Sequence, residues 1–293
     1  MSKINRIKSS LIDTKKEINF VFNGKKFKGF KGDTLGSALL ANNVKLIGRS
    51  FKYHRPRGII SHGSEEPNGL VEIINEHYNE PNTKVTTVEL YEGLKAKSQN
   101  CWPSVKYDLM SINDKVSNFI SAGFYYKTFM WPSSFWEKVY EPLIRKAAGL
   151  GSLSLSNSGR NSEKGFIHCE VLIIGSGPSG LISAYIAGFS GARVLLVEED
   201  FVFGGSLNNE AFYISDMLAQ DWVKFIIKKL NKLTNVKLMK KTEIIGMFDH
   251  GVFGAIEKNK YKKIDQIFWK ITTKKTLLCS GSTERLIPFQ NND

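Results

Sequence analysis

The residues of this chain whose spacing most suggests chemistry are three glycines arranged as GxGxxG. Residues 175–180 read Gly-Ser-Gly-Pro-Ser-Gly. Gly175 permits a tight turn from a strand into a helix, Gly177 lets the backbone approach a pyrophosphate, and Gly180 lets the helix lie close to the strand. The first N–H groups of that helix attract an anion. The spacing predicts a dinucleotide-binding turn; the alternative is an ordinary glycine-rich turn in an α/β domain.

Two acidic residues follow the glycines after about twenty residues, the distance expected of a ribose-binding acid. Glu198 and Glu199 come directly after an apolar run, residues 194–197. A carboxylate at this position accepts hydrogen bonds from an adenosine ribose and repels a 2′-phosphate. The acid therefore favours an unphosphorylated ribose, but it does not distinguish NAD from FAD.

The elements that must position these groups follow from the apolar pattern. Residues 171–174 fit a buried parallel strand, residues 181–189 fit a helix, and residues 194–197 fit a second parallel strand. A second glycine-rich turn, residues 203–207, suits the close approach of the same dinucleotide. This order predicts a Rossmann-like βαβ unit.

The rest of the carboxyl-terminal region is predicted to form a helix and a strand meander. Residues 216–233 have the period of an amphipathic helix. Its inward positions are Met217, Leu218, Trp222, Phe225, Ile226 and Leu230. Strands are expected over residues 243–249, 252–257, 266–272 and 275–282. The last of these runs into Gly281.

The amino-terminal region has the element order of a β-grasp, or ferredoxin-like, domain. Residues 18–30 alternate apolar and polar side chains around Asn23-Gly24, which predicts a hairpin. Residues 32–34 cap a short helix that contains Leu35, Ala38 and Leu39. Further strands are expected over residues 70–74 and 85–90.

A long loop in this type of domain supplies closely spaced cysteines when a [2Fe-2S] cluster is present. Here the loop, residues 48–58, reads GRSFKYHRPRG and contains no cysteine, so no iron-sulfur cluster is expected. The loop is basic instead. Its side chains either grip a phosphate or a partner's carboxylates, or serve as exposed charges that tie the loop down. These side chains are Arg49, Lys52, Arg55 and Arg57. His54 is interpreted as a packed or hydrogen-bonded loop residue rather than a catalyst.

Residues 99–150 are rich in aromatic side chains, which are costly to leave in water. They are expected to pack between domains or against another subunit; a membrane-surface role is less favoured because no clean helical stripe is present. The rings belong to Trp102, Phe124, Tyr125, Tyr126, Phe129, Trp131, Phe135, Trp136 and Tyr140. Residues 149–165 are predicted to form a flexible surface linker.

Length and charge narrow the class of protein further. The chain has 293 residues, room for about two domains, and a formal net charge of +13. Fourteen Lys or Arg and three Asp or Glu lie in residues 1–60. Such a positive field attracts nucleic acid, an anionic cofactor or an acidic partner. No nucleic-acid-binding motif accompanies it, so the favoured interpretation is that these charges form an ordinary solvent-exposed surface.

The three cysteines are too far apart in sequence for a zinc or four-thiolate site. No signal peptide or membrane span is recognised, so a reduced, cytoplasmic protein is expected. The predicted division is a β-grasp, [2Fe-2S] ferredoxin-like domain lacking cluster cysteines over residues 1–95, an aromatic-rich connector and linker over 96–165, and an incomplete Rossmann-like FAD/NAD(P)-binding α/β domain over 166–293.

Several strings of residues together resemble one family, the alpha subunit of heterotetrameric sarcosine oxidase. They are GRSFKYHRPRG (48–58), EEPN (65–68), SQNCWPS (98–104), AGFYYKTFMWP (122–132) and YEPLIRKAAGLG (140–151). The resemblance covers nearly all of the chain from about residue 18. It implies part of a flavoenzyme that oxidatively demethylates sarcosine to glycine, forms peroxide and passes the one-carbon unit to tetrahydrofolate.

The same resemblance implies the cofactors and partners. The alpha subunit holds NAD, while FAD in the beta subunit and FMN at the alpha-beta interface belong to an assembly with beta-, gamma- and delta-type chains. By position, the pyrophosphate of NAD would be contacted by Gly175, Gly177, Pro178, Ser179 and Gly180. Glu198 or Glu199 would bind the ribose, and the nucleotide would be lined by Gly205, Ser206 and Gly281.

The chain departs from that family by ending several hundred residues earlier, which indicates a fragment or one half of a split subunit. No catalytic residue and no metal ligand is assigned. Two alternatives remain open: a subunit of a related amine or opine dehydrogenase or hydrogen cyanide synthase-type complex, and a non-catalytic nucleotide-binding scaffold.

Overall fold

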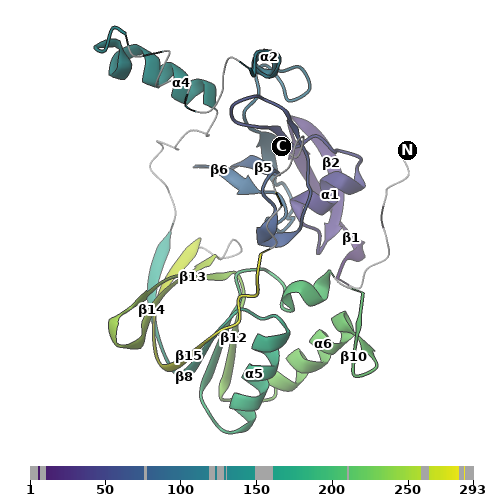
Figure 1. Cartoon of the computed structure of the whole chain (residues 1–293). Helices are drawn as coiled ribbons and strands as arrows, with labels where there is room; N and C mark the ends of the chain where they lie inside the picture. The colour runs from purple at the N-terminus through teal and green to yellow at the C-terminus, as the bar shows by residue number, and fades with distance from the viewer. Residues whose placement is uncertain are drawn as a thin grey trace. The chain divides into compact units, whose positions relative to one another are not determined.

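Two units make up the computed structural model, residues 1–158 and residues 159–293, and each is described by itself (Figure 1). The structure describes residues 6, 11–75, 78–118, 123, 129, 131–148, 161–209, 211–258, 264–283 and 287. Within these residues, no helix combines the length and apolar character required to cross a bilayer.

The first unit begins with the predicted hairpin. Strands β1 (Asp13–Phe22) and β2 (Lys25–Lys31) pair antiparallel, and the turn between them has positive φ angles of 50° at Asn23 and 75° at Gly24. This is the backbone that a two-residue turn matching the strand twist requires. Helix α1 (Leu35–Ala41) follows, with Thr34 as its N-cap. Both the hairpin and the capped helix are therefore confirmed.

The sheet of the first unit has the strand order β2-β1-β7-β5-β6. Its other strands are β5 (Leu70–Ile74), β6 (Asn79–Lys84) and β7 (Lys95–Ser98). β7 is parallel to β1 and antiparallel to β5, so the sheet extends past residue 95. Helix α1 packs against the sheet over a buried apolar core that includes Phe20, Leu39 and Ile73.

The strand predicted over residues 85–90 is wrong. This segment turns beneath α1, where its backbone carbonyls cap the helix: the N–H of Gly36 donates to the carbonyl of Val85, and the N–H of Leu35 donates to that of Val88, both at 2.8 Å. Its apolar side chains are buried as core filling rather than as one face of a strand. Burial, not strand pairing, accounts for its apolar pattern.

Short elements complete the first unit. They are β3 (Gly48–Arg49), β4 (Pro56–Arg57), η1 (Gly63–Glu65), η2 (Leu109–Ser111), α2 (Ile112–Lys115), the π-helical turn η3 (Trp136–Tyr140) and α4 (Glu141–Ala148). Among the aromatic residues predicted to be packed, Trp102 is 64% exposed and Trp131 is 85% exposed. Phe124, Tyr125 and Tyr126 lie outside the described residues.

The second unit is built on a six-stranded sheet with the order β12-β9-β8-β15-β14-β13. The parallel part consists of β12 (Val236–Met239), β9 (Val194–Val197), β8 (Ser162–Ile174) and β15 (Gln266–Leu278). β14 (Val252–Lys258) and β13 (Thr242–Phe248) extend it antiparallel, joined by η5 (Asp249–Gly251). β9 has the predicted bounds.

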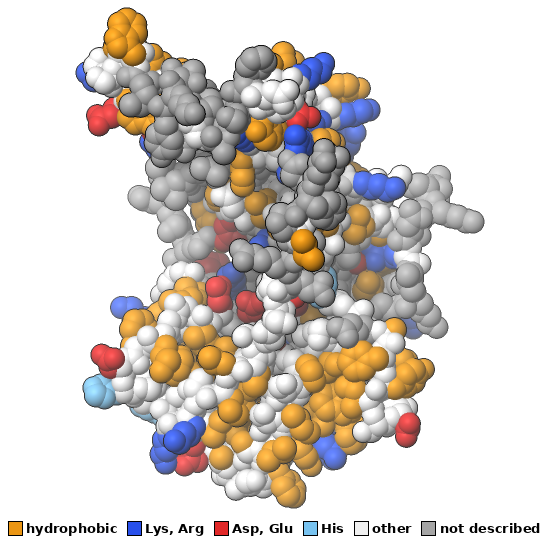
Figure 2. Space-filling view, in the orientation of Figure 1, with side chains coloured by type: hydrophobic (Ala, Val, Ile, Leu, Met, Phe, Trp, Pro, Cys, Tyr) orange, Lys and Arg blue, Asp and Glu red, His pale blue; other side chains and the backbone are white. Residues whose placement is uncertain are grey.

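Helices α5 (Pro178–Phe189) and α6 (Ala219–Leu230) cover one face of the parallel strands (Figure 1). Between them lie η4 (Gly205–Asn208), β10 (Tyr213–Ile214) and β11 (Met217–Leu218). The helix predicted over residues 216–233 is thus shorter, because Met217 and Leu218 belong to β11. Of its other predicted inward positions, Trp222, Ile226 and Leu230 are buried and Phe225 is exposed. Figure 2 shows hydrophobic side chains on the outward side of α5 and α6.

Two further expectations in this unit need correction. The strands predicted over residues 266–272 and 275–282 are one strand, β15, because it pairs continuously with β8. β8 itself begins at Ser162, inside the segment predicted to be a linker, residues 149–165. Residues 149–160 of that segment lie outside the described residues.

Candidate dinucleotide site

The glycine-rich loop leaves β8 at Ile174 and enters α5 at Pro178. Gly175 has a φ of +97°, and its N–H donates to the carbonyl of Val197 at 2.9 Å. A Cβ at Gly175 would collide with the carbonyl oxygen of Cys279, just past β15. A Cβ at Gly180 would collide with the carbonyl oxygen of Gly175. The first and third glycines are therefore required by close backbone packing.

The middle glycine is different, because its missing side chain would face open space. Gly177 is the N-cap of α5, with an ordinary φ of −63°, and within the part of the chain that the structure describes no heavy atom lies within 4 Å of a Cβ built there. No side chain caps the helix. The first N–H groups of a helix have no partner within it, and its dipole favours an anion at this end. Open backbone and a helix start together fit a pyrophosphate.

A second glycine turn lies directly against the first. Gly204 and Gly205 have φ angles of 124° and 54°, which favour glycine. A Cβ at Gly205 would lie 3.2 Å from the Cα of Gly177, so the two backbones approach closely. The N–H of Gly204 lies 3.1 Å from both the carbonyl oxygen and the Oγ of Ser176. The second turn therefore borders the space in front of Gly177.

The two acidic residues occupy different environments. Glu198, at the end of β9, is buried; its Oε2 accepts hydrogen bonds from the N–H of Ser176 at 2.8 Å and from its Oγ at 2.5 Å, while Oε1 accepts from the N–H of Asp200 at 3.0 Å. Glu199 is exposed. A carboxylate has about four acceptor positions, so the three donors found among the described residues leave Glu198 about one for a further donor. Glu198 is thus the acid that adjoins the glycine loop.

The remaining residues predicted to contact a nucleotide lie at exposed positions of these segments. Pro178 and Ser179 are the first two residues of α5, and Ser206 is in η4. Gly281 has a φ of +71° and open space around a Cβ. It follows Cys279, whose N–H donates to the carbonyl of Ile174 at 2.8 Å. The structure therefore brings the ends of β8, β9 and β15 together at the carboxyl edge of the parallel strands, where nucleotides bind in such sheets.

This arrangement provides binding groups rather than reactive ones. Burial raises the pKa of the thiol of Cys279, which packs near the glycine loop, and also raises the pKa of Cys101 and Cys169. A thiol with a raised pKa is a poor nucleophile at neutral pH. Within the described part of the chain, no cluster of three or more His, Cys, Asp or Glu side chains is suited to a metal ion.

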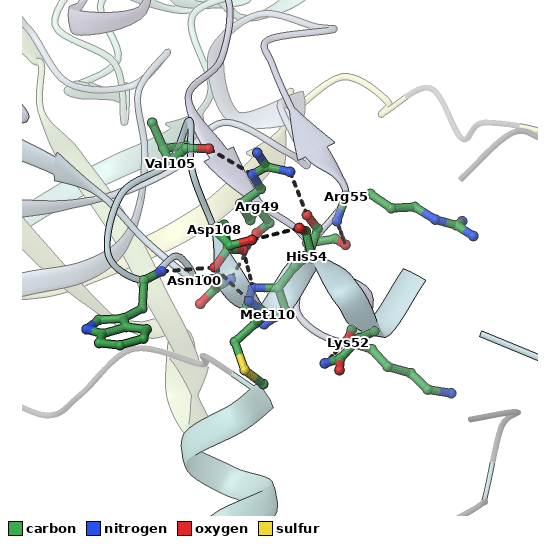
Figure 3. Close-up of polar contacts among 12 residues, drawn as sticks. Arg49, Lys52, His54, Arg55, Asn100, Val105, Asp108 and Met110 are labelled. Carbon is green, nitrogen blue, oxygen red and sulfur yellow. Dashed lines mark hydrogen bonds and ion pairs between the residues drawn. The ribbon is translucent and has the colours of Figure 1, made fainter. Parts of the chain in front are cut away.

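The basic loop of the first unit is held by its own side chains and backbone (Figure 3). Arg49 donates to the carbonyl oxygens of Val105 at 2.9 Å, His54 at 3.0 Å and Lys106 at 3.3 Å. Arg55 donates to Asp114 at 2.7 Å. Arg49 and Arg55 tie the loop to residues 105–114, as in the second of the two interpretations, but both are partly buried rather than exposed.

His54 is a buried, hydrogen-bonded residue, as predicted. Its Nδ1 lies 2.6 Å from Oδ2 of Asp108, which is also buried. The other oxygen of Asp108 accepts from the N–H groups of Trp102 at 3.0 Å and Met110 at 3.3 Å. Asp108 was not anticipated from the sequence, because nothing near residue 108 marks it as the partner of His54.

Two family models match the chain, one in each unit. Residues 15–101 match the 2Fe-2S iron-sulfur cluster binding domain, and residues 170–264 match the FAD dependent oxidoreductase family. Together with the sheets described above, these matches confirm the predicted fold class: a ferredoxin-like domain followed by a Rossmann-like FAD/NAD(P)-binding domain. The glycine loop, the second turn and Glu198 all lie within the second match.

The residues of the first unit do not fit an iron-sulfur cluster. A [2Fe-2S] cluster is held by four thiolates, or by two thiolates and two histidines, whereas Cys101 is the one cysteine in residues 15–101 of the sequence. In the structure, His54 is already paired with Asp108. The ferredoxin-like fold is thus present without the ligand set that would hold a cluster.

Curated relatives match the chain along its whole length. It is 45% identical to sarcosine oxidase subunit alpha of Rhizobium meliloti over 100% of this chain, and 29% identical to sarcosine oxidase subunit alpha of Corynebacterium sp. strain P-1 over 96%. The matches cover 30% and 25% of those relatives, so the chain spans less than a third of their length.

A solved structure with a similar fold covers both units. L-proline dehydrogenase from P. horikoshii superimposes with a TM-score of 0.60 at 20% identity, covering 95% of this chain and 43% of that one. At this identity the similarity shows the fold alone. The ferredoxin-like and Rossmann-like folds therefore occur together in that protein as well.

Proposed function

We propose, on the premise that the chain is a homologue of sarcosine oxidase alpha subunits over its whole length, that it is the NAD-binding part of a flavoenzyme subunit. One observation carries the proposal. The open face of Gly177, the second glycine turn and the buried Glu198 converge at the carboxyl edge of the parallel strands. A bound nicotinamide dinucleotide supplies hydride-transfer chemistry, and the chain supplies its binding and orientation.

Each group has a separate task in this proposal. The backbone at Gly177 and the N–H groups of Ser179 and Gly180 bind the pyrophosphate at the start of α5. Glu198, rather than the exposed Glu199, accepts a hydrogen bond from the adenosine ribose, because it adjoins the glycine loop. Pro178 suits the first position of the helix because it has no N–H group, and an N–H at that position would have no partner within the helix. The nucleotide is lined further by Gly205, Ser206 and Gly281.

The activity of the whole complex is a wider proposal. We infer that the chain serves an enzyme that oxidatively demethylates sarcosine to glycine, forms peroxide and transfers the one-carbon unit to tetrahydrofolate. FAD and FMN act in the assembled enzyme, with beta-, gamma- and delta-type subunits as partners and a cytoplasmic location. The relatives' names, sarcosine oxidase subunit alpha, support the oxidation of sarcosine by an enzyme of several subunits, and we assign no catalytic residue in this chain.

Nucleotide extraction and titration test the binding proposal. The full chain is purified, denatured and searched chromatographically for released NAD, NADP and FAD; the nucleotide-free chain is then titrated calorimetrically with each. We expect NAD to bind at least about tenfold more tightly than NADP, since the carboxylate of Glu198 repels a 2′-phosphate. Absence of binding by every dinucleotide would refute the site, and preferential binding of FAD would refute the assignment to NAD.

Co-purification with a beta-type subunit tests the wider proposal. Sarcosine-dependent peroxide formation by the assembled complex is the expected result. Faster turnover of proline or an opine than of sarcosine would instead identify a related amine or opine dehydrogenase. Bound NAD that no substrate reduces would favour a nucleotide-binding scaffold.

A further inference from the structure

One buried hydroxyl connects the three parts of the candidate dinucleotide site. Ser176 lies between the first two glycines of the loop, and its residue has no exposed surface. Its Oγ donates to Oε2 of Glu198 at 2.5 Å and accepts from the N–H of Gly204 at 3.1 Å. The hydroxyl therefore links the acid at the end of β9 with the second glycine turn.

The direction of these hydrogen bonds is fixed by chemistry. The N–H of Gly204 can only donate, and an ionised carboxylate can only accept, so the single hydroxyl proton of Ser176 must point to Glu198. The result is one donor–acceptor chain from Gly204 through Ser176 to Glu198. Hydrogen bonds in such a chain strengthen one another in a buried environment. A displacement of the second turn is thus coupled to the orientation of the carboxylate.

We propose that Ser176 is a positioning residue for nucleotide binding, whose hydroxyl orients the Glu198 carboxylate toward the adenosine ribose. The inference rests on the proposed function, because it requires a dinucleotide at this site. It goes further by assigning ribose recognition to a pair of residues rather than to the acid alone. Ser176 itself, being buried, does not contact the nucleotide through its hydroxyl.

The distribution of acceptor positions supports this role. Among the described residues, Oε2 of Glu198 receives both the N–H and the Oγ of Ser176, whereas Oε1 receives the N–H of Asp200 alone. The spare acceptor position is therefore on Oε1. Two donors on Oε2 hold the carboxylate plane in one orientation, which directs Oε1 for a ligand hydroxyl without loss of side-chain freedom on binding.

Backbone hydrogen bonds hold the glycine loop and the second turn together even without the Ser176 hydroxyl. The N–H of Ser176 also donates to Glu198, and the N–H of Gly204 also lies 3.1 Å from the carbonyl oxygen of Ser176. Both connections persist when Oγ is removed. Ser176→Ala should consequently leave the loop in place, while the Glu198 carboxylate loses one of its three donors and is held less firmly.

The test pairs this variant with a ligand that lacks the recognised hydroxyl. The full chain and its Ser176→Ala variant are titrated with NAD and with NAD whose adenosine ribose is 2′-deoxy. For the unaltered chain we expect the 2′-deoxy ligand to bind about tenfold more weakly, as for a lost hydrogen bond to a charged group. In Ser176→Ala we expect this ratio to fall to about twofold or less, mainly because NAD binding weakens.

Matched variants identify the cause. Ser190→Ala removes an exposed serine hydroxyl at the other end of α5 and should keep the tenfold ratio. Ser176→Cys retains a weak donor of similar size and should give an intermediate ratio. A merely structural role would weaken both ligands equally and leave the ratio unchanged.

The outcomes separate this inference from the function on which it rests. Failure of the unaltered chain to bind NAD refutes the proposed function. Binding with an unchanged ratio in Ser176→Ala refutes the positioning role alone. If Ser176→Ala and Ser176→Cys both fail to fold, the hydroxyl is a structural element and the positioning role is likewise overturned.

Discussion

The basic loop of the first unit and the glycine loop of the second differ in what holds them. Residues 48–58 are rich in charged side chains, and those of Arg49 and Arg55 bind other parts of their own unit. Residues 175–180 have little side-chain volume, and the position of Gly177 stays open. The side chains of the basic loop form hydrogen bonds within their own unit, whereas the glycine loop leaves backbone N–H groups available to a ligand.

This contrast explains why charge is a poor guide to a site in this chain. Arg49 has guanidinium contacts with three backbone carbonyl oxygens, so its donors serve the fold. In the glycine loop, an added Cβ would collide with backbone at Gly175 and Gly180, but it would meet open space at Gly177. A substitution that breaks the contacts of the basic loop should accordingly lower stability, whereas a substitution at Gly177 should lower nucleotide affinity.

The largest effect is expected from Gly180→Ala. The new Cβ would collide with the carbonyl oxygen of Gly175, which is backbone and cannot give way as a flexible side chain would. We expect the second unit to lose about 3–4 kcal/mol or more of its free energy of unfolding, as for a severe core clash. Hydrogen–deuterium exchange, read separately in the two units, checks this; native protection of β8 and α5 in the variant would contradict it.

Asp108→Ala should have the next largest effect, this time in the first unit. It leaves the buried His54 ring nitrogen and the partly buried N–H groups of Trp102 and Met110 without their acceptor. We expect a loss of about 3 kcal/mol in the free energy of unfolding, measured by denaturant titration. NAD affinity should be unchanged.

The control for that variant is Asp114→Ala, which removes the half-exposed partner of Arg55. An exposed ion pair contributes about 0–1 kcal/mol. Equal losses in the two variants would show that the buried pair does not hold the basic loop.

Glu198→Gln is expected to have a smaller effect on stability. The amide group has one acceptor oxygen and one donor nitrogen, so it cannot accept from both Ser176 and Asp200. A loss of about 1–2 kcal/mol follows, together with weaker discrimination between NAD and NADP. Calorimetric unfolding and titration measure the two; a variant that still rejects NADP as strongly would exclude Glu198 as the discriminating acid.

The smallest effect concerns Glu170, whose side chain is 39% exposed. A hydrogen bond from the N–H of Arg193, and then the ammonium of Lys274, lower the pKa of its carboxyl below the usual range. A lowered folded-state pKa stabilises the fold above the pKa of an unfolded glutamate, and this is lost as the pH falls through the folded-state pKa. Glu170→Gln should therefore reduce stability slightly at pH 7, and the difference from the unaltered chain should shrink as the pH falls below the pKa of an unfolded glutamate. A difference that does not shrink on acidification would contradict this cause.

Local chemical signals made much of the fold predictable from sequence. Asn23-Gly24 determines a hairpin through its backbone preference, and the apolar run Val194–Val197 suits only a buried strand. β7 was missed because Lys95–Ser98 has no apolar pattern; it lies in the middle of a sheet through its pairing with β1 and β5. Likewise, the polar start of β8 looked like a linker, and pairing with β15 makes it a strand.

The parts of the site that depend on backbone conformation were predictable from the sequence. The parts that depend on contacts between residues distant in sequence were not. The spacing of Gly175, Gly177 and Gly180 follows from steric needs that a sequence displays. The choice of Glu198 over Glu199 depends on which side of β9 faces the glycine loop, and the role of Ser176 depends on contacts with residues 198 and 204. The GxGxxG pattern leaves its second position unspecified, so a buried hydroxyl there carried no signal.

Titration of Gly177→Ala with NAD tests the central claim most directly. Because the added methyl group meets open space at an ordinary φ, the free energy of unfolding without nucleotide should change by less than about 1 kcal/mol. The methyl group occupies the space proposed for the pyrophosphate, so NAD affinity should fall at least about tenfold. Ile186→Ala, at an exposed position of the same helix, should leave that affinity unchanged. An unaltered affinity in a folded Gly177→Ala variant would contradict the account.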